Sequence, residues 1–350
     1  NGYSYINDQI LPTHTLAQGF PPPMPESLTN PTTGLIAVAT NYGSTRVMQY
    51  NFTVQKEFSG NVVSAAYVAA LTRHGLLSPN IDQPLPGPGN VDIRRPYYSL
   101  FPNISTISYF ISANSANYHS MQLVFERRLS HGLTINSNFV WAHALTGGAP
   151  GQLINNWALE HGSTGTDIRL RWTFTANYRL PFDKVPNTFL KHVIGGWDLN
   201  AIAVVASGLP FTVTNATPRE NISSAATQPG GATVSDRPNR LSGCAGYATN
   251  QTITSWLNAA CFASQPLYAA GNSGPNILYG PPNRHLDLSL FKSIPIKEAV
   301  QVQFRAEAYN ITNTPSFSNP AAAFGSSSFG VISSTVGTPR QLGLALKLLF

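Results

Sequence analysis

The sequence predicts an all-β protein, an antiparallel transmembrane β-barrel, from three observations. Apolar and polar residues alternate without a break across segments such as 168–180, which is the period of a β-strand. Charged residues make up only 10% of the chain, against about 25% in soluble domains. Short and long connections between these segments alternate along the chain, as in outer-membrane barrels, which have short periplasmic turns and long external loops.

The last stretch of the chain, residues 340–350, shows the alternation in its plainest form. The residues on its apolar face are Leu342, Leu344, Leu346, Leu348 and Phe350. Small or polar residues occupy the opposite face. Such a face needs cover, from the second sheet of a soluble sandwich or from lipid around a barrel. The low charge and the alternating loop lengths favour the barrel.

The first predicted strands follow a loop region. Residues 1–45 are rich in Pro, Asn, Gly and Thr and are expected to form an extracellular loop region, leaving 46–350 as the barrel portion. Residues 46–57 place Met48, Tyr50 and Phe52 on one face. A turn at Gly60 leads to small and apolar residues at 62–72, which indicates a hairpin.

The middle strands are separated by longer excursions. Strand 118–129 and strand 133–143 flank a tight turn around Gly132, whereas the short apolar segment 105–111 is expected to belong to a loop and not to the wall. Strand 168–180 exceeds the usual length of a soluble strand and matches a tilted bilayer crossing. Strand 196–207 follows a medium turn.

The carboxy-terminal strands follow the longest excursion, residues 208–283. They are expected at 285–292, 300–311 and 340–350, with a short turn at 293–299. The wall then has about nine strands, an odd number, whereas bacterial single-chain barrels have an even number. We therefore expect the carboxy-terminal part of a larger barrel, in a processed chain or a fragment.

The composition also excludes other classes. No run of 18 apolar residues occurs, so no transmembrane helix is predicted. The net charge of +6 comes from dispersed residues, which argues against nucleic-acid binding. Cys244 and Cys261, the two cysteines, lie in one Gly- and Asn-rich excursion and are expected to form a local disulfide, with two free thiols as the alternative.

Several segments resemble a known family. They are residues around 115–134 (Asn-Tyr-His-Ser-Met-Gln-Leu-Val-Phe-Glu-Arg-Arg), Gly-Gly-Trp-Asp-Leu-Asn at 195–200, Ala-Ser-Gly-Leu-Pro-Phe-Thr-Val at 206–213, Arg-His-Leu-Asp-Leu-Ser-Leu-Phe-Lys at 284–292, Val-Gln-Phe-Arg-Ala-Glu-Ala-Tyr-Asn at 302–310, and 338–350. Together they resemble TonB-dependent outer-membrane receptors, in particular the Oar-like group, over most of 46–350.

The resemblance implies a barrel of about 22 strands, an amino-terminal plug in its lumen and import driven by the TonB energy-coupling complex of the inner membrane. The plug, the TonB box and the early strands are not among the matching segments. Coupling to TonB is therefore expected through a missing amino-terminal region. Phe350 resembles the family's assembly signal, which the barrel-insertion machinery reads.

Candidate functional residues come from the predicted faces and loops. Arg169, Arg171, Arg305 and Glu307 fall on lumen faces, where they either contact a plug or solute or keep the lumen solvated. The predicted lipid-interface aromatics are Trp141, Trp172, Tyr178 and Trp197. Trp256, near Cys261, is either a ligand contact or a loop-packing residue.

No catalytic motif occurs, and neither a cofactor nor a metal is expected. The predicted function is an outer-membrane receptor in TonB-coupled uptake of a large or scarce solute, such as a siderophore, oligosaccharide or peptide. Its expected partners are membrane lipid, the barrel-insertion machinery, the TonB complex and that ligand, with no nucleic acid. The alternatives are a plug-less porin or adhesin-like barrel and a secreted all-β binding protein.

Overall fold

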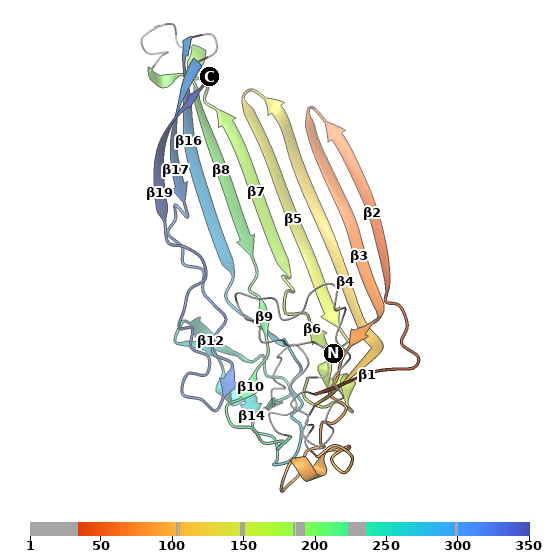
Figure 1. Cartoon of the computed structure of the whole chain (residues 1–350). Helices are drawn as coiled ribbons and strands as arrows, with labels where there is room; N and C mark the ends of the chain where they lie inside the picture. Colours follow the sequence, from red (N-terminus) through yellow and green to blue (C-terminus); the bar gives the residue numbers. More distant parts are fainter. Residues whose placement is uncertain are drawn as a thin grey trace, which may run out of the picture.

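A computed structural model describes residues 34–102, 104, 106–147, 151–184, 186, 193–222, 236–297 and 300–350 (Figure 1). The largest element is one curved sheet. The expected loop region 1–45 lies largely outside the described residues, and its described part contains the short strand β1 (Leu35–Val38), which pairs in parallel with β4.

The wall of the sheet contains nine strands in sequence order, each antiparallel to its neighbours. They are β2 (Arg46–Phe58), β3 (Asn61–Leu77), β4 (Ile107–Ser130), β5 (Leu133–Thr146), β7 (Leu170–Arg179), β8 (Trp197–Ala206), β16 (Asn283–Lys297), β17 (Val300–Tyr309) and β19 (Gln341–Leu349). The nine predicted strands are confirmed. Within the described residues the barrel is not closed, since β2 and β19 form the two edges of the sheet.

Two expectations about the strand ends were wrong. Segment 105–111 is not a separate loop, because from Ile107 onward it is the first part of β4 and Ile111 pairs with Leu77 of β3. The turn expected at 293–299 is wrong over 293–297, because these residues belong to β16. These extensions escape sequence patterning because a strand that continues past the lipid no longer needs one apolar face.

The tight turns and the long connections lie at opposite ends of the sheet (Figure 1). We call the end with the tight turns and the carboxy-terminus the short-turn end, and the other the loop end. The β2–β3 turn has φ values of 46° at Ser59 and 75° at Gly60, and the β4–β5 turn has 52° at His131 and 78° at Gly132. Positive φ at both central residues is what a type I′ hairpin turn requires.

One face of the wall is apolar from edge to edge. Residues directly opposite each other on neighbouring strands lie on the same face of the sheet. Each series of paired residues therefore forms a row that crosses the strands on one face. One row consists of Val54, Ala65, Leu123, Phe139, Trp172 and Val205. A second consists of Tyr178, Leu199, Leu290, Ala306 and Leu344. The apolar side chains of β19 are largely exposed on this face, as expected for contact with lipid.

The other face is polar. One of its rows consists of Thr134, Asn177, Asn200, Ser289, Glu307 and Gly343. Polar side chains near the short-turn end, including Glu126, Asn136 and Asn177, line a hollow of about 440 Å³ on the wall. This division into an apolar and a polar face is the one that separates lipid from lumen in an outer-membrane barrel.

The long connections form small strand pairs beyond the loop end (Figure 1). The pairs are β9 (Pro210–Phe211) with β15 (Leu278–Tyr279), β10 (Thr214–Asn215) with β18 (Ala323–Phe324), β11 (Asn239–Arg240) with β14 (Phe262–Ala263), and β12 (Tyr247–Thr252) with β13 (Ser255–Leu257). We call the described parts of 78–106, 151–166, 208–282 and 312–339 the loop module. Among the described residues, no helix is both long and apolar enough to cross a membrane.

Candidate functional site

The loop module has its own apolar core. Its buried members are Phe211, Val213, Leu257, Cys261, Phe262 and Leu278. Phe324 and Phe329, from the connection before β19, pack against Phe262 with ring centroids 6.0 and 5.8 Å away. Two separate excursions of the chain therefore share one core, which makes the module a folded unit and not a set of independent loops.

A disulfide joins Cys244 and Cys261, whose Cα atoms lie 5.4 Å apart. Cys261 is buried in the apolar core and Cys244 packs against it. Trp256 lies in the same region. Its ring packs against this core and its Nε1 donates to the carbonyl oxygen of Tyr279 at 3.4 Å.

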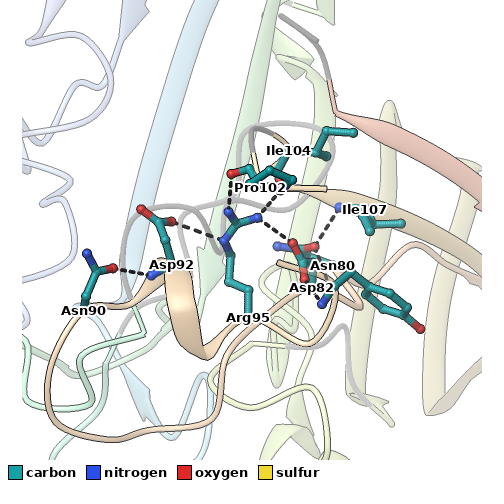
Figure 2. A network of polar contacts seen from close by, with 9 residues as sticks. Asn80, Asp82, Asn90, Asp92, Arg95, Pro102, Ile104 and Ile107 are labelled. Carbon is teal, nitrogen blue, oxygen red and sulfur yellow. Dashed lines mark hydrogen bonds and ion pairs between the residues drawn. The ribbon is translucent and has the colours of Figure 1, made fainter. Parts of the chain in front are cut away.

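The first of the module's buried polar clusters surrounds Arg95 (Figure 2). Its guanidinium forms an ion pair with Asp82 at 2.8 Å, and the side chains are 2% and 0% exposed. The same group donates to the carbonyl oxygens of Pro102 and Ile104, and it contacts the Asp92 carboxylate at 3.2 Å. Asp82 also accepts the Tyr97 amide at 2.8 Å. This network fixes the connection between β3 and β4.

The second buried cluster joins three connections. Arg237 makes a two-pronged contact with Glu160, with distances of 2.8 and 2.7 Å between guanidinium nitrogens and carboxylate oxygens. Glu160, in the short 3-10 helix Trp157–Glu160, also accepts the Gln152 amide at 2.8 Å. The Gln83 side chain donates to the Gln152 carbonyl and accepts the Ile154 amide. Connections around 83, 152–160 and 237 are thereby locked together.

Asp236 and Glu220 lie beside the Arg237–Glu160 pair, and their carboxyl groups differ in how many hydrogen bonds they accept. Both oxygens of Asp236 are occupied: Oδ1 accepts from Asn215 and Gln265, and Oδ2 accepts the backbone amides of Arg219 and Glu220. Glu220 is 1% exposed, and no described residue donates a well-formed hydrogen bond to either of its oxygens. Burial and the Asp236 carboxylate raise the pKa of Glu220 to about 8, against smaller opposing effects of Gln152 and Arg237.

A third cluster connects the module to the wall. Asp167, in the turn before β7, accepts the Ala144 amide and contacts His143 Nδ1, both at 2.8 Å, and accepts the Tyr279 hydroxyl at 2.7 Å. Burial alone would raise the pKa of Asp167, but the hydrogen bonds from Tyr279, Ala144 and His143 outweigh it and lower the pKa. Because Tyr279 belongs to β15, this carboxylate ties the module to β5.

The predicted lumen residues do not form one cluster. Arg305 and Glu307 lie on the polar face with 3.3 Å between Arg305 Nη2 and Glu307 Oε1, and the Arg305 guanidinium lies 4.3 Å from the Phe291 ring centroid. Arg171 is exposed on β7, opposite Val140 and Ala206. Arg169 precedes β7 and its side chain hydrogen-bonds Tyr279.

The predicted interface aromatics lie on the apolar face. Trp141 is opposite Met121 and Leu170, at the loop-end half of the wall. Trp172 donates from Nε1 to Ser137 at 2.9 Å. Tyr178 and Trp197 lie near the short-turn end, on β7 and β8. Phe350 follows β19 and is 96% exposed.

Trp197 has a charged neighbour on the apolar face. Lys292 Nζ lies 5.1 Å from the Trp197 ring centroid and donates to the carbonyl oxygens of Val193 and Gly195 at 2.7 and 2.9 Å. These bonds satisfy the ammonium group at the short-turn end, where long cationic side chains reach the interface.

Sequence reasoning missed the buried ion pairs of the loop module. Asp82, Arg95, Glu160 and Arg237 are isolated charges in irregular segments, and their partners are between 13 and 77 residues away. No local pattern pairs them. No group of three or more His, Cys, Asp and Glu side chains capable of holding a metal ion occurs among the residues described.

The two-faced antiparallel wall and its one-sided loop module define the class of an outer-membrane β-barrel. Residues 1–342 match the family model described as the outer membrane beta barrel domain. The chain therefore belongs to this family and is part of a barrel of the bacterial outer membrane. Comparison with curated proteins gave no match.

Three of the solved structures that are similar to this chain are an iron transporter, an outer membrane transporter and a pyoverdine receptor. The FrpB iron transporter from Neisseria meningitidis (F3-3 variant) is 11% identical at a TM-score of 0.42, over 90% of this chain and 33% of that one. The outer membrane transporter YddB from Escherichia coli is 11% identical at 0.45, over 91% and 34%. The pyoverdine outer membrane receptor FpvA from Pseudomonas aeruginosa PAO1 is 9% identical at 0.46, over 87% and 30%. The chain spans about a third of the length of these structures.

Proposed function

We propose that this chain is the carboxy-terminal barrel portion of an outer-membrane receptor that takes part in TonB-coupled uptake of a large or scarce solute. The observation that carries the proposal is the segregation of the connections. The long ones fold into one module at the loop end, while the tight turns lie at the other end. A passive pore needs no such folded cap, whereas a receptor needs a shaped surface on which to capture its ligand.

The orientation follows from the same segregation. The short-turn end, with Phe350, faces the periplasm, and the loop module faces the medium. Solute is captured by the loop module and then passes along the polar face, past residues such as Asn177, Asn200 and Arg171. The apolar face is in lipid. The coupling itself belongs to a plug and TonB-contacting segment outside this sequence, as the resemblance to Oar-like receptors implies.

The proposed solute is a siderophore, an oligosaccharide or a peptide, and the irregular loops, where the specificity of such receptors resides, select among them. The polar face carries both amides and charged groups and favours none of the three. Arg169, Arg171, Arg305 and Glu307 are proposed as solute or plug contacts, and Phe350 as the signal for barrel insertion.

The test uses the native full-length protein in its own host. Outer membranes are analysed by a heat-modifiability gel, and uptake of radiolabelled ferric siderophore, maltooligosaccharide and tripeptide is compared between the wild type and a deletion strain. We expect a heat-modifiable outer-membrane species and saturable uptake of one probe that disappears when a protonophore dissipates the proton-motive force.

Other results would select the alternatives. Uptake that rises linearly with solute concentration and is unaffected by the protonophore would identify a plug-less porin. An intact barrel whose deletion changes uptake of no probe but abolishes attachment to a surface would identify an adhesin-like barrel. A product that is soluble without detergent would contradict the barrel and leave a secreted all-β binding protein.

A further inference from the structure

The most unusual group in the loop module is the Glu220 carboxyl. It is 1% exposed, and neither oxygen receives a well-formed hydrogen bond from a described residue. A buried ionised carboxylate normally gathers several donors, as Asp236 does beside it. Because an unpaired buried charge is strongly unfavourable, this environment suits the neutral acid better than the anion.

The charges around Glu220 also favour its neutral form. Asp236 and Glu160 are anionic neighbours, and the charge of Arg237 is already engaged by Glu160 at 2.8 and 2.7 Å. Arg219, next in the chain, directs Nε to the carbonyl oxygen of Gln265 at 2.6 Å. The one guanidinium that acts on Glu220, that of Arg237, is thus shared with Glu160, and a proton on Glu220 would reduce the excess of negative charge.

A neutral Glu220 also supplies a missing donor. Gln152 lies beside Glu220 and is fully buried; its side-chain contact favours the Glu220 anion, but less than burial and Asp236 disfavour it, and its Oε1 has no donor among the residues described. A protonated carboxyl can donate one hydrogen bond. Protonation would thus satisfy two groups at once, whereas ionisation would leave an acceptor-only carboxylate facing Asp236 and Glu160.

Glu220 lies where several connections meet. Arg94, from the connection between β3 and β4, donates to the carbonyl oxygen of Asn221 at 2.5 Å, and Asn221 donates to Gly87 at 2.8 Å. On the other side, the Glu220 amide binds Asp236, and the adjacent Arg237 holds Glu160. Repulsion at Glu220 therefore acts on the contact among connections around 87–94, 152–160 and 236–237.

We propose that the closed loop module holds one proton on Glu220, and that release of this proton as pH rises loosens the contact among these three connections. The inference concerns the folding of the loop module and does not depend on the solute or on energy coupling. It gives the module a pH-sensitive switch: compact in mildly acidic surroundings and more open in alkaline ones.

The sign follows from linkage. Glu220 has a pKa of about 8 in the closed module against an ordinary value of 4.5. Its contribution to stability is therefore fully present below the ordinary value and is lost as pH rises to about 8. Since opening releases one proton in that window, the opening equilibrium rises about tenfold per pH unit and levels off above it.

The experiment is hydrogen exchange of the native full-length protein in detergent, between pH 5 and pH 9. Protection factors, which correct for the intrinsic pH dependence of exchange, are measured in peptides that contain Gln152–Glu160 and Arg237. In the wild type we expect them to fall about tenfold per pH unit up to about pH 8. Glu220→Gln, which cannot ionise, should keep protection nearly constant.

The control is Glu57→Gln, which removes an exposed carboxylate paired with Arg128 at 2.9 Å in the wall and should keep the wild-type slope. If Glu220→Gln fails to assemble, Glu220→Met serves in its place, because a side chain without donors can be replaced by an apolar one of similar size. Wild-type protection that stays constant with pH, or a slope retained in Glu220→Gln or Glu220→Met, would overturn the proposal.

Discussion

Asp82 and Asp92 contact the same guanidinium group, that of Arg95, from different environments. The Asp82 side chain is 0% exposed, whereas that of Asp92 is 58% exposed. Coulombic attraction is weakly screened in the interior and strongly screened at the surface. Only the buried contact should therefore hold the connection between β3 and β4 in place.

The substitution Asp82→Asn tests this. The new side-chain amide would keep an oxygen for the Tyr97 backbone amide but would leave the Arg95 charge without its buried partner. Breaking one side of a buried pair costs about 3–5 kcal/mol. We expect hydrogen exchange in residues 92–102 to accelerate accordingly, while protection in the wall strands is unchanged.

Asp92→Asn is the matched control, since it alters a carboxylate on the same guanidinium. Exposed pairs contribute about 0–1 kcal/mol, so exchange in 92–102 should change little. Equal effects of the two substitutions would mean that burial does not decide the strength of these contacts.

Asp167 gives a prediction with the opposite pH dependence to Glu220. Its pKa is lowered from 3.8 by the Tyr279, Ala144 and His143 hydrogen bonds, which outweigh burial. The stability it contributes is therefore present above pH 3.8 and lost as pH falls through the lowered value. Amides of residues 144 and 279 should keep their protection down to about pH 4 and lose it below.

Asp167→Asn should weaken the same contact at neutral pH. With Oδ1 kept for the Ala144 amide, the new amide nitrogen replaces Oδ2, so both Tyr279 and His143 lose their charged acceptor. Each lost hydrogen bond costs about 1–3 kcal/mol. Hydrogen exchange at residues 144 and 279 measures the effect. Unchanged protection in this variant would show that the module is attached to the wall by other contacts.

At the scale of the element, β7 shows how one strand serves two surroundings. Phe174 lies between Ser137 and Ala203 on the apolar face, and its neighbour Thr175 lies between Asn136 and Ile202 on the polar face. A charged side chain on the lipid face costs about 2–4 kcal/mol for Arg at the bilayer midplane, while the lumen face tolerates it.

We therefore expect Phe174→Arg to reduce the amount of heat-modifiable barrel in the outer membrane, and Thr175→Arg to leave it near the wild-type level. The two positions are adjacent, so strand propensity and depth are matched. The opposite ranking on the same gel would mean that the two faces are assigned the wrong way round.

The disulfide closes the segment that contains β13 and Trp256. Cys244 and Cys261 are 17 residues apart, and cross-linking a loop of this length stabilises by about 3 kcal/mol in the chain-entropy account. Replacing both by Ser should raise exchange in residues 240–265 and leave the wall strands unaffected. No change would indicate that the apolar core alone fixes this segment.

Sequence patterning predicted the wall well because lipid imposes one rule on every strand. The alternation in 168–180 and 340–350 follows directly from that rule, and β7 and β19 lie there. The rule ends where the lipid ends, so the pattern predicts a loop where the first residues of β4 lie. In the module, contacts such as Glu160 with Arg237 depend on tertiary placement, which local spacing does not encode.

At the scale of the whole molecule, the loop module and the wall are stabilised by different physics. The wall divides lipid from a polar face, whereas the module has an apolar core and buried ion pairs like a small soluble domain. Because module connections leave from β3, β5, β8 and β17, closing the module also fixes the spacing of the strands at the loop end. The conformation of the loop module and the geometry of the wall are coupled in this way.

The two edges of the sheet give the last prediction. β2 and β19 each pair on one side only among the described residues, and an unpaired backbone group in lipid costs several kcal/mol. Residues 46–350, exported alone, should therefore fail to give a heat-modifiable species and should aggregate, while the native full-length protein gives one. A stable, heat-modifiable monomer from 46–350 would show instead that β2 and β19 can pair with each other and close a small barrel.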